Sequence, residues 1–266
     1  MTPIAVTIAG SDSSGGAGIQ ADLKTFSALG VYGASVIAAL TAQNTRGVQG
    51  IHDVPPAFVT QQIDSVFSDL SVWAVKIGML SRPETIGAVA DGLARHRARN
   101  VVLDPVMVAT SGDRLLAPEA VEALRERLIP AALIITPNLP EAAALLDETV
   151  ARTEDEMRTQ GERLLALGAT AVLIKGGHGE APESVDILVD RLGTTRLPAP
   201  RIATRNTHGT GCTLSSAIAA GLATGLSLHD AVAAAKAYVT AAIAASERLT
   251  IGHGSGPVHH FHASWT

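Results

Sequence analysis

The sequence predicts an α/β protein of the three-layer α/β/α type, with a mostly parallel central sheet and helices on both faces. Short apolar runs alternate with amphipathic stretches along the whole chain, and this alternation is typical of parallel strands joined by helices. Hydrophobic residues make up 47% of the chain but aromatic residues only 3%, so aliphatic side chains must form the core, as in sheets buried on both faces. The 266 residues suffice for one large domain, and no Gly/Ser/Pro-rich linker divides them. We therefore expect a single domain over residues 1–266.

The predicted strands are short apolar runs that end in polar or glycine-containing turns. They span 4–9, 34–41, 73–77, 101–103, 132–135 and 171–174, with an antiparallel edge pair at 185–189 and 195–197. The predicted helices have apolar residues at helical spacing, and several begin near a proline. They span 17–29, 56–70, 83–96, 118–128, 140–146, 154–167, 212–224 and 228–249.

Charge and cysteine content exclude several classes of partner. The formal net charge is −5, the pI is about 6.0 and no basic run occurs, so neither a nucleic acid nor a membrane surface is expected as a partner. One cysteine cannot form an intramolecular disulfide and is typical of a reducing compartment. No signal peptide or long apolar run is apparent. We expect a cytoplasmic protein.

The polar segments of the chain follow the predicted strands. In open parallel sheets ligands bind beyond the carboxyl ends of the strands, so these segments should surround one site. They are residues 10–12, 43–44, 78–79 and 104–105, Asn138 with Glu141, and residues 175–177.

The most informative segment is residues 206–215, NTHGTGCTLS, directly before an alanine-rich helix. Unpaired N–H groups and the helix dipole make such a helix start a binding site for an anion, most often phosphate. Cys212 lies in this turn, and a thiol at a helix N-terminus has a lowered pKa, so it could act as a base. Phosphoryl transfer is one interpretation. A turn that only caps a core helix, with an inert Cys212, is the other.

Three oxygen-bearing side chains suit a magnesium ion that bridges phosphates. Asp104 follows a hydrophobic strand, and Asn138 and Glu141 are three residues apart at a helix start. Magnesium prefers such oxygen ligands, often through water. Lys175 ends a strand before two glycines, where its ammonium could contact a phosphate. Asn-x-x-Glu also occurs as a plain helix cap, and a lysine at a strand end is often only solvated.

The loop 10–18, GSDSSGGAG, follows the first strand and opens a helix without matching a Walker A motif. Its glycines allow close approach of a bound molecule. Asp22 and Gln43 together could bind a flat heteroaromatic amine, although Asp22 alone is more typical of a solvated helix residue.

These motifs together resemble the ribokinase-like superfamily, and more closely its hydroxymethylpyrimidine/phosphomethylpyrimidine kinases of thiamin biosynthesis. The resemblance spans nearly the whole chain in order. It rests on residues 7–22, 42–45, 76–80, 103–107, 136–142, 175–178, 208–212 and 256–262.

The resemblance implies a ribokinase-like fold and two successive ATP-dependent phosphorylations, of 4-amino-5-hydroxymethyl-2-methylpyrimidine and then of its monophosphate. By similarity, the aminopyrimidine would contact Gln43, Asp22, Gly10, Met79 and Val106. The ATP phosphates would contact Asn138, Lys175 and the turn that contains Gly209, Thr210, Gly211 and Cys212. Asp104 and Glu141 would act on Mg²⁺ through water. Sugar kinases of the superfamily have Asp where this chain has Cys212, which favours the pyrimidine kinases, and Cys212 would take the hydroxymethyl proton.

Several alternatives stay open at this stage. Pyridoxal kinase is the nearest, followed by a catalytically idle binding protein and a cysteine hydrolase with His208 as the base. The C-terminal histidines His253, His259, His260 and His262 match no zinc signature. The resemblance implies a homodimer, and short loops at 111–113 and 177–179 are candidates for closing the site.

Overall fold

The computed structural model describes residues 1–107, 118–178 and 183–265, and within them nine strands form one sheet in the order β3-β2-β1-β4-β5-β6-β7-β8-β9. Neighbouring strands from β2 to β7 pair parallel, whereas β3, β8 and β9 pair antiparallel with their neighbours. The strands are β1 (Ile4–Gly10), β2 (Tyr32–Asn44), β3 (Gly47–Asp53), β4 (Ala74–Ile77), β5 (Val101–Leu103), β6 (Ile134–Ile135), β7 (Ala171–Ile174), β8 (Glu183–Asp190) and β9 (Gly193–Pro200).

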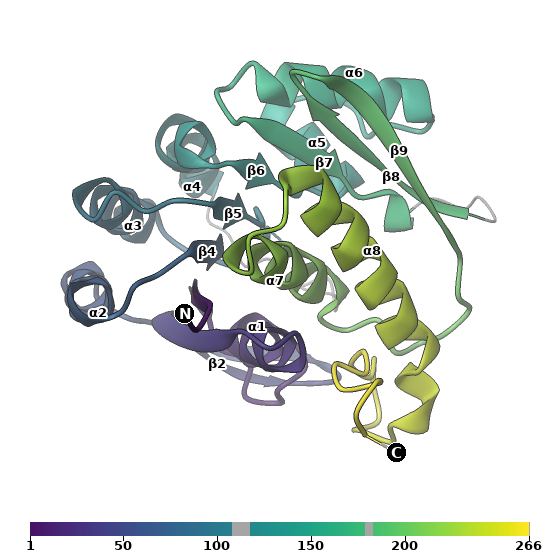
Figure 1. The fold of residues 1–266 in the computed structure, drawn as a ribbon, viewed down its shortest axis with the longest axis horizontal. Helices are drawn as coiled ribbons and strands as arrows, with labels where there is room; N and C mark the ends of the chain where they lie inside the picture. The colour runs from purple at the N-terminus through teal and green to yellow at the C-terminus, as the bar shows by residue number, and fades with distance from the viewer. Residues whose placement is uncertain (108–117, 179–182, 266) are drawn as a thin grey trace.

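Helices cover both faces of this sheet (Figure 1). One face packs against α1, α7 and α8, and the other against the remaining helices. The helices are α1 (Gly18–Ala28), α2 (Pro56–Asp69), α3 (Pro83–Arg95), α4 (Pro118–Ala123), α5 (Leu139–Leu146), α6 (Glu154–Leu165), α7 (Thr210–Ala223) and α8 (Leu228–Ala244). The predicted three-layer α/β/α architecture is confirmed.

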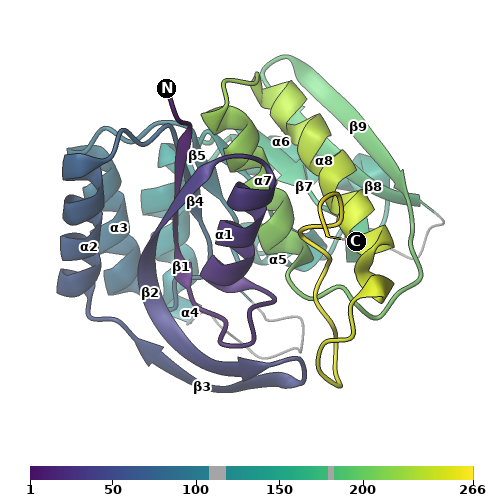
Figure 2. The same ribbon diagram turned by 60° about the horizontal axis from the view of Figure 1, so that its bottom comes forward.

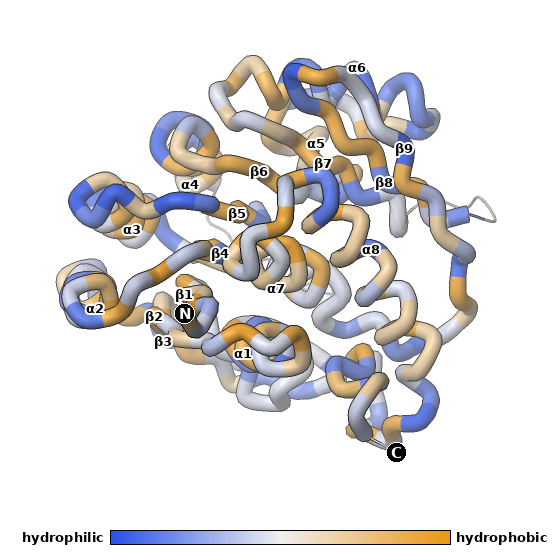
Figure 3. Tube along the Cα trace, in the orientation of Figure 1, coloured by the Kyte–Doolittle hydropathy of each residue, from blue (hydrophilic) through white to orange (hydrophobic). Residues whose placement is uncertain are grey.

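The core consists of two apolar layers on either side of the sheet. Val6, Ile77 and Leu103 belong to the layer beneath α2 to α6, and Phe26 and Ile218 to the layer beneath α1, α7 and α8. Figure 3 shows the hydrophobic colouring along β6 and β7 and hydrophilic segments on the outer turns of α3 and α6. Burial of apolar surface on both faces explains why β5, β6 and β7 are purely aliphatic.

The structure differs from the sequence prediction mainly at the β2 edge. β2 extends to Asn44 and returns as β3 in an antiparallel hairpin (Figure 2). The sequence of β3, GVQGIHD, contains two glycines and is mostly exposed, so it lacks a clear alternation of apolar and polar residues. The predicted antiparallel edge pair is confirmed as β8 and β9. The predicted closing loop 111–113, and residue 179 of the other, lie outside the described residues.

Within the described residues, no helix combines the length and the apolar composition needed to cross a bilayer.

Candidate active site

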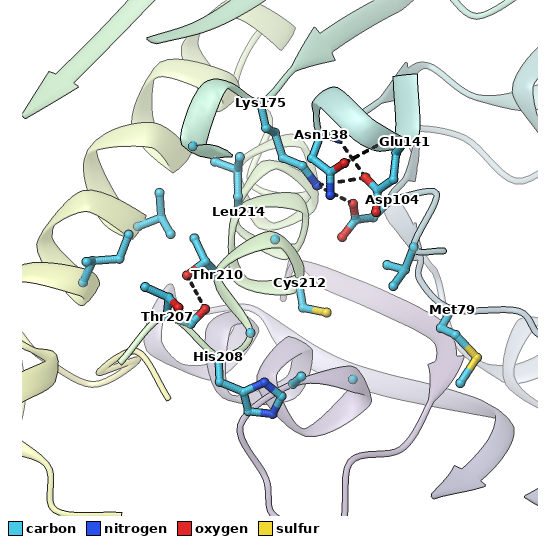
Figure 4. A pocket seen from close by; sticks show the side chains of 18 of the residues that line it. Met79, Asp104, Asn138, Glu141, Lys175, Thr207, His208, Thr210, Cys212 and Leu214 are labelled. Atoms are coloured by element: carbon cyan, nitrogen blue, oxygen red, sulfur yellow. Dashed lines mark hydrogen bonds and ion pairs between the residues drawn. The ribbon is translucent and has the colours of Figure 1, made fainter. Parts of the chain in front are cut away.

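A cavity of about 740 Å³ opens at the carboxyl ends of the parallel strands. All of the predicted site residues except Asp22 line this cavity. The predicted residues that line it are Gly10, Gln43, Met79, Asp104, Val106, Asn138, Glu141, Lys175, Gly209, Thr210, Gly211 and Cys212. Figure 4 shows Lys175, Asn138, Glu141 and Asp104 grouped together, with Cys212 between them and His208.

The start of α7 requires glycine at Gly209 and has a second glycine at Gly211. Gly209, the N-cap, has φ +79°, and a Cβ there would lie 1.9 Å from the carbonyl oxygen of Gly16. A Cβ on Gly211 would lie 3.3 Å from Lys175 Nζ and 3.6 Å from Asp104 Oδ2. The missing side chains therefore leave the first-turn N–H groups of α7 open toward Lys175, as an anion site requires.

Thr210, a predicted phosphate contact, also makes two hydrogen bonds within this turn. Its hydroxyl donates to the carbonyl oxygen of Thr207 at 2.7 Å, and its backbone N–H donates to the same oxygen at 3.2 Å. The polar donors of Thr210 thus stabilise the turn, and the N–H groups of Gly211 and Cys212 are the ones that remain for an anion.

Opposite the helix start, Lys175 lies between two carboxylates. Its Nζ is 2.8 Å from Asp104 Oδ1 and 3.8 Å from Glu141 Oε2. Burial alone would lower the pKa of Lys175, but Asp104 and Glu141 raise it, so the ammonium stays charged. Burial would raise the pKa of Asp104, but Lys175 and Lys76 hold it below its usual range. Asp104 is therefore an anion with cations on both sides.

Glu141 forms a capping box with Asn138 at the start of α5. The Asn138 side-chain Oδ1 accepts from the Glu141 backbone N–H at 2.9 Å, and Glu141 Oε2 accepts from the Asn138 backbone N–H at 2.8 Å. Burial, with Asp104 nearby, raises the pKa of Glu141 to about 7, while Lys175 opposes the increase. The cap fixes the carboxylate beside Lys175.

Asp104 and Glu141 could hold a magnesium ion that other oxygen donors complete. No cluster of three or more His, Cys, Asp or Glu side chains with metal-binding geometry occurs in the parts of the chain that the structure describes. Two carboxylates beside an anion site fit an ion that takes its remaining ligands from phosphate and water, as magnesium commonly does. They do not fit a metal bound by protein ligands alone.

The other end of the cavity is shaped by Gln43 and Met79. The register of β2 against β3 shifts between Ala42 and Gln43, and such a bulge redirects the side chain that follows it. Ser13 Oγ both donates to the Gln43 carbonyl oxygen and accepts from its N–H. A Cβ on Gly10 would lie 2.7 Å from Met79 Cε, so the glycine leaves room for the thioether.

Asp22 requires a correction. It is 0% exposed and both its oxygens accept from Lys76 Nζ at 2.9 Å, in addition to hydroxyl bonds from Thr7 and Ser216, both at 2.6 Å. A carboxylate so fully bonded beneath the cavity is not available to a pyrimidine amine. The sequence signal that could have identified its partner is Lys76 itself, a charge in the middle of a fully buried strand.

The predicted lowering of the Cys212 pKa is also wrong. Burial raises the pKa of the thiol to about 11, and the charges of Asp22 and Asp104 add to the increase. Lys76 and the backbone N–H of Gly18 oppose it without reversing it. Near neutral pH, Cys212 is therefore a thiol rather than a thiolate.

The sequence analysis missed a buried contact between Asp12 and His208. Asp12 Oδ2 lies 2.8 Å from His208 Nε2 and also accepts from the N–H groups of Gly16 and Ala17. Burial would raise the pKa of Asp12, but the hydrogen bonds with His208 and Ser14 lower this pKa to about 2. With Nε2 bonded to Asp12, His208 joins two loops, an arrangement that does not favour a Cys–His hydrolase.

The sequence analysis also missed an apolar extension of the cavity beside α7 and α8. Aliphatic side chains from both helices line it, together with residues that follow β9. They are Ile202, Leu214, Val239 and Ile243. A flat heteroaromatic base would bury its faces in such a slot.

The four C-terminal histidines do not form a metal site within the described residues. His260 is buried with Nε2 3.1 Å from Thr213 Oγ1, and burial lowers the pKa of its ring to about 3. His259 donates its backbone N–H to Ala242. The C-terminus therefore packs on α7 and α8.

Comparisons with known proteins point to one group of kinases. The family model described as phosphomethylpyrimidine kinase matches residues 12–259. Hydroxymethylpyrimidine/phosphomethylpyrimidine kinase from Rhizobium meliloti is 64% identical over 100% of this chain and 99% of its own length. The protein of the same name from Escherichia coli K12 is 59% identical, with 98% of each chain covered.

Solved structures agree. A Bacillus subtilis pyridoxal kinase in complex with ADP has a TM-score of 0.92 and 38% identity, with 100% of both chains covered. A phosphomethylpyrimidine kinase from Clostridium difficile 630 has a TM-score of 0.80 and 48% identity over 90% of this chain and 99% of that one. The ribokinase-like fold expected from the sequence is confirmed.

The buried Lys76–Asp22 pair makes a stability prediction. Asp22→Asn leaves a buried ammonium without its anion, so we expect the free energy of unfolding to fall by about 3–5 kcal/mol. Lys76→Met should cost a similar amount, and the double variant less than the sum of both. Urea unfolding measures all three. Asp91→Asn, which removes the exposed ion pair with Arg127, is the control and should cost under about 1 kcal/mol. Losses below that value in all variants would contradict the argument.

The raised pKa of Cys212 makes a prediction about reactivity. A thiol with a pKa of about 11 is only about 0.1% thiolate at pH 8, against roughly a quarter for an ordinary cysteine. We expect alkylation of the folded protein by iodoacetamide at pH 8 to be at least about 50-fold slower than that of the urea-unfolded chain. The rate should rise about tenfold per pH unit between pH 8 and 10. A plateau near pH 7 would instead identify a preformed thiolate.

Proposed function

This chain belongs to the phosphomethylpyrimidine kinase family, and we propose that it phosphorylates 4-amino-5-hydroxymethyl-2-methylpyrimidine and then its monophosphate, with ATP as the donor, for thiamin biosynthesis. The observation that supports this most is one cavity with two chemically different ends. Gln43 and Met79 line one end, and Lys175 with the start of α7 lines the other. We propose that residues 1–266 act as a single kinase domain.

The aminopyrimidine is proposed to lie at the Gln43 end. A glutamine side chain offers both a carbonyl acceptor and an amide donor, so it can pair with an amino group and an adjacent ring nitrogen. The Met79 thioether and the Val106 side chain offer apolar contacts to the ring, and sulfur contacts with aromatic rings are favourable. Gly10 leaves the space between them open.

The phosphates of ATP are proposed to bind where the cations and the helix start meet. The N–H groups of Gly211 and Cys212 would contact phosphate oxygens, and Lys175 would move from Asp104 and Glu141 toward the transferred group. The Asn138 side-chain amide adds a donor from the start of α5. The apolar slot beside Leu214 and Val239 suits the adenine base.

We propose Mg²⁺ as the ion held by Asp104 and Glu141. When bound, it neutralises charge on the transferred phosphoryl group. The chain itself holds both carboxylates in place: Lys175 and Thr136 donate to Asp104, and the Asn138 cap fixes Glu141.

Cys212 is proposed to orient the acceptor rather than to remove its proton. Its thiol is protonated near neutral pH because burial raises its pKa. Phosphoryl transfer depends chiefly on positioning and charge stabilisation. In the second transfer the acceptor is a phosphate oxygen, which is already largely ionised at neutral pH, so that step needs no base. The second transfer therefore needs no preformed thiolate.

A second candidate function is pyridoxal phosphorylation. The solved structures similar to this chain include pyridoxal kinases from Bacillus subtilis and, in complex with AMP-PCP and pyridoxal, from Staphylococcus aureus. The fold alone therefore does not select the acceptor, and the side chains at the Gln43 end must.

We expect ADP release with ATP and Mg²⁺ when either the hydroxymethylpyrimidine or its monophosphate is the acceptor, and kcat/KM for pyridoxal at least about tenfold lower. A coupled ADP assay measures all three acceptors.

Lys175→Met should lower kcat/KM for both pyrimidines by roughly 10²-fold or more, because the variant lacks the ammonium that would contact the transferred phosphate. Pyridoxal as the best acceptor would assign the second function. No ADP with any acceptor would contradict the kinase assignment.

We also propose a cytoplasmic homodimer. Among the described residues, β3 is the last strand at its end of the sheet, and apolar Leu40 and Ile51 on this hairpin are 47% and 41% exposed. Exposed apolar surface at the edge of a sheet favours association with a second copy. The lone cysteine agrees with a reducing compartment.

Light scattering after gel filtration should give the mass of two chains rather than that of one 27.3 kDa chain. Ile51→Glu should shift the protein toward the monomer, because a buried charge opposes the contact. Leu192→Glu, at an 87% exposed position between β8 and β9, is the control and should leave the mass unchanged. A monomer in the unaltered protein would contradict the proposal.

A further inference from the structure

A segment near the C-terminus, residues 252–260, contacts two loops at the cavity that are far apart in the sequence. One loop is the turn 44–46 directly after Gln43, and the other is 206–208, directly before Gly209. In Figure 2 the yellow C-terminal coil lies beside the tip of the β2–β3 hairpin. A cavity of about 90 Å³ lined by Gln43, His208 and Ser255 lies where the three segments meet. We call residues 252–260 the C-terminal segment.

The contact with the first loop centres on Thr45. Its Oγ1 accepts the backbone N–H of Gly254 at 3.1 Å and that of His253 at 3.3 Å. Its carbonyl oxygen accepts the N–H of Ser255 at 2.9 Å. A Cβ on Gly254 would lie 1.9 Å from that carbonyl oxygen. The two backbones are thus so close that only glycine fits.

The contact with the second loop is a short parallel bridge. The N–H of His208 donates to Gly256 at 3.0 Å, and the N–H of Val258 donates to His208 at 3.4 Å. A Cβ on Gly256 would lie 2.2 Å from Asn206 Oδ1. Further on, His260 contacts Thr213 in the first turn of α7. The segment therefore links the Gln43 turn to the helix start where the anion site lies.

We infer that the C-terminal segment is a positioning element of the acceptor site, and that Thr45 is the positioning residue that couples it to Gln43. This inference rests on the proposed function for the identity of the acceptor. Gln43 must present the hydroxymethyl oxygen in line with the phosphoryl group at the start of α7, and errors of about 1 Å in such alignment cost roughly 10² in rate. Gln43 and Gly209 lie on separate elements, and the segment bonds to residues beside both.

Two variants of Thr45 separate positioning from simple folding. Thr45→Val keeps the volume but removes the oxygen that accepts two N–H groups, whereas Thr45→Ser keeps it. Thr224→Val, at the far end of α7 where the hydroxyl donates only to Gly221, is the matched control. The measurements are the Kd of the hydroxymethylpyrimidine by calorimetry without nucleotide, the KM for ATP, and amide exchange over residues 43–46.

We expect Thr45→Val to raise the pyrimidine Kd about tenfold, because the turn that presents Gln43 loses its two hydrogen bonds from His253 and Gly254. The same loss should speed amide exchange over residues 43–46. The ATP KM should change less than about twofold, and Thr45→Ser and Thr224→Val should match the unaltered protein. An unchanged Kd with unchanged exchange would overturn the inference, as would equal rises in the pyrimidine Kd and the ATP KM. If the unaltered protein fails to bind the pyrimidine, the proposed function fails, whereas the exchange result still decides whether Thr45 orders the Gln43 turn.

Discussion

The hydrogen bonds of the Asp22 carboxylate join two strands of the sheet and two helices on one of its faces. Asp22 lies on α1 and accepts from Lys76 on β4, Thr7 on β1 and Ser216 on α7. A buried ammonium and a buried carboxylate are each costly alone, so the elements that supply them must stay together. Because α7 begins at Thr210, less than two turns before Ser216, the same contacts place its N-terminus at the carboxyl ends of the strands. Fold and site depend on one interaction.

The charge of Lys76 also sets the character of the cavity floor. Burial alone would lower its pKa, but the negative charges of Asp22 and Asp104 raise it, so the ammonium stays charged. The charges of this cation and of Lys175 both lower the pKa of Asp104. The buried Lys76 ammonium and the helix start are fixed, so these groups need little reorganisation when phosphate charge develops, and such preorganisation is where most electrostatic catalysis comes from. A neutral Cys212 is consistent with it, because a thiolate there would compete with phosphate for the same donors.

The sequence could predict the architecture and most of the cavity lining because both follow from local pattern. Aliphatic runs predict strands, and strand ends in an open parallel sheet meet at one edge. Roles that depend on distant partners could not be predicted. Asp22 looked free because its partner Lys76 lies 54 residues away, and His208 looked like a base because Asp12 lies 196 residues away. Burial sets the pKa of the Cys212 thiol, and the spacing of residues in the sequence does not indicate how deeply that thiol is buried.

Acceptor choice is a matter of a few side chains rather than of the fold. A pyridoxal kinase superposes on this chain with a TM-score of 0.92, higher than the 0.80 of a phosphomethylpyrimidine kinase that shares more sequence. Similar backbones therefore serve both ring types, as expected when function resides in the site. A polar group that pairs with the ring discriminates far more strongly than apolar shape does, because a mismatch leaves it unpaired. The amide of Gln43 is the group that we propose for this role: the Thr41 hydroxyl lies 3.2 Å from its Oε1, and the Ser13 hydroxyl bonds to its backbone beside the bulge of β2.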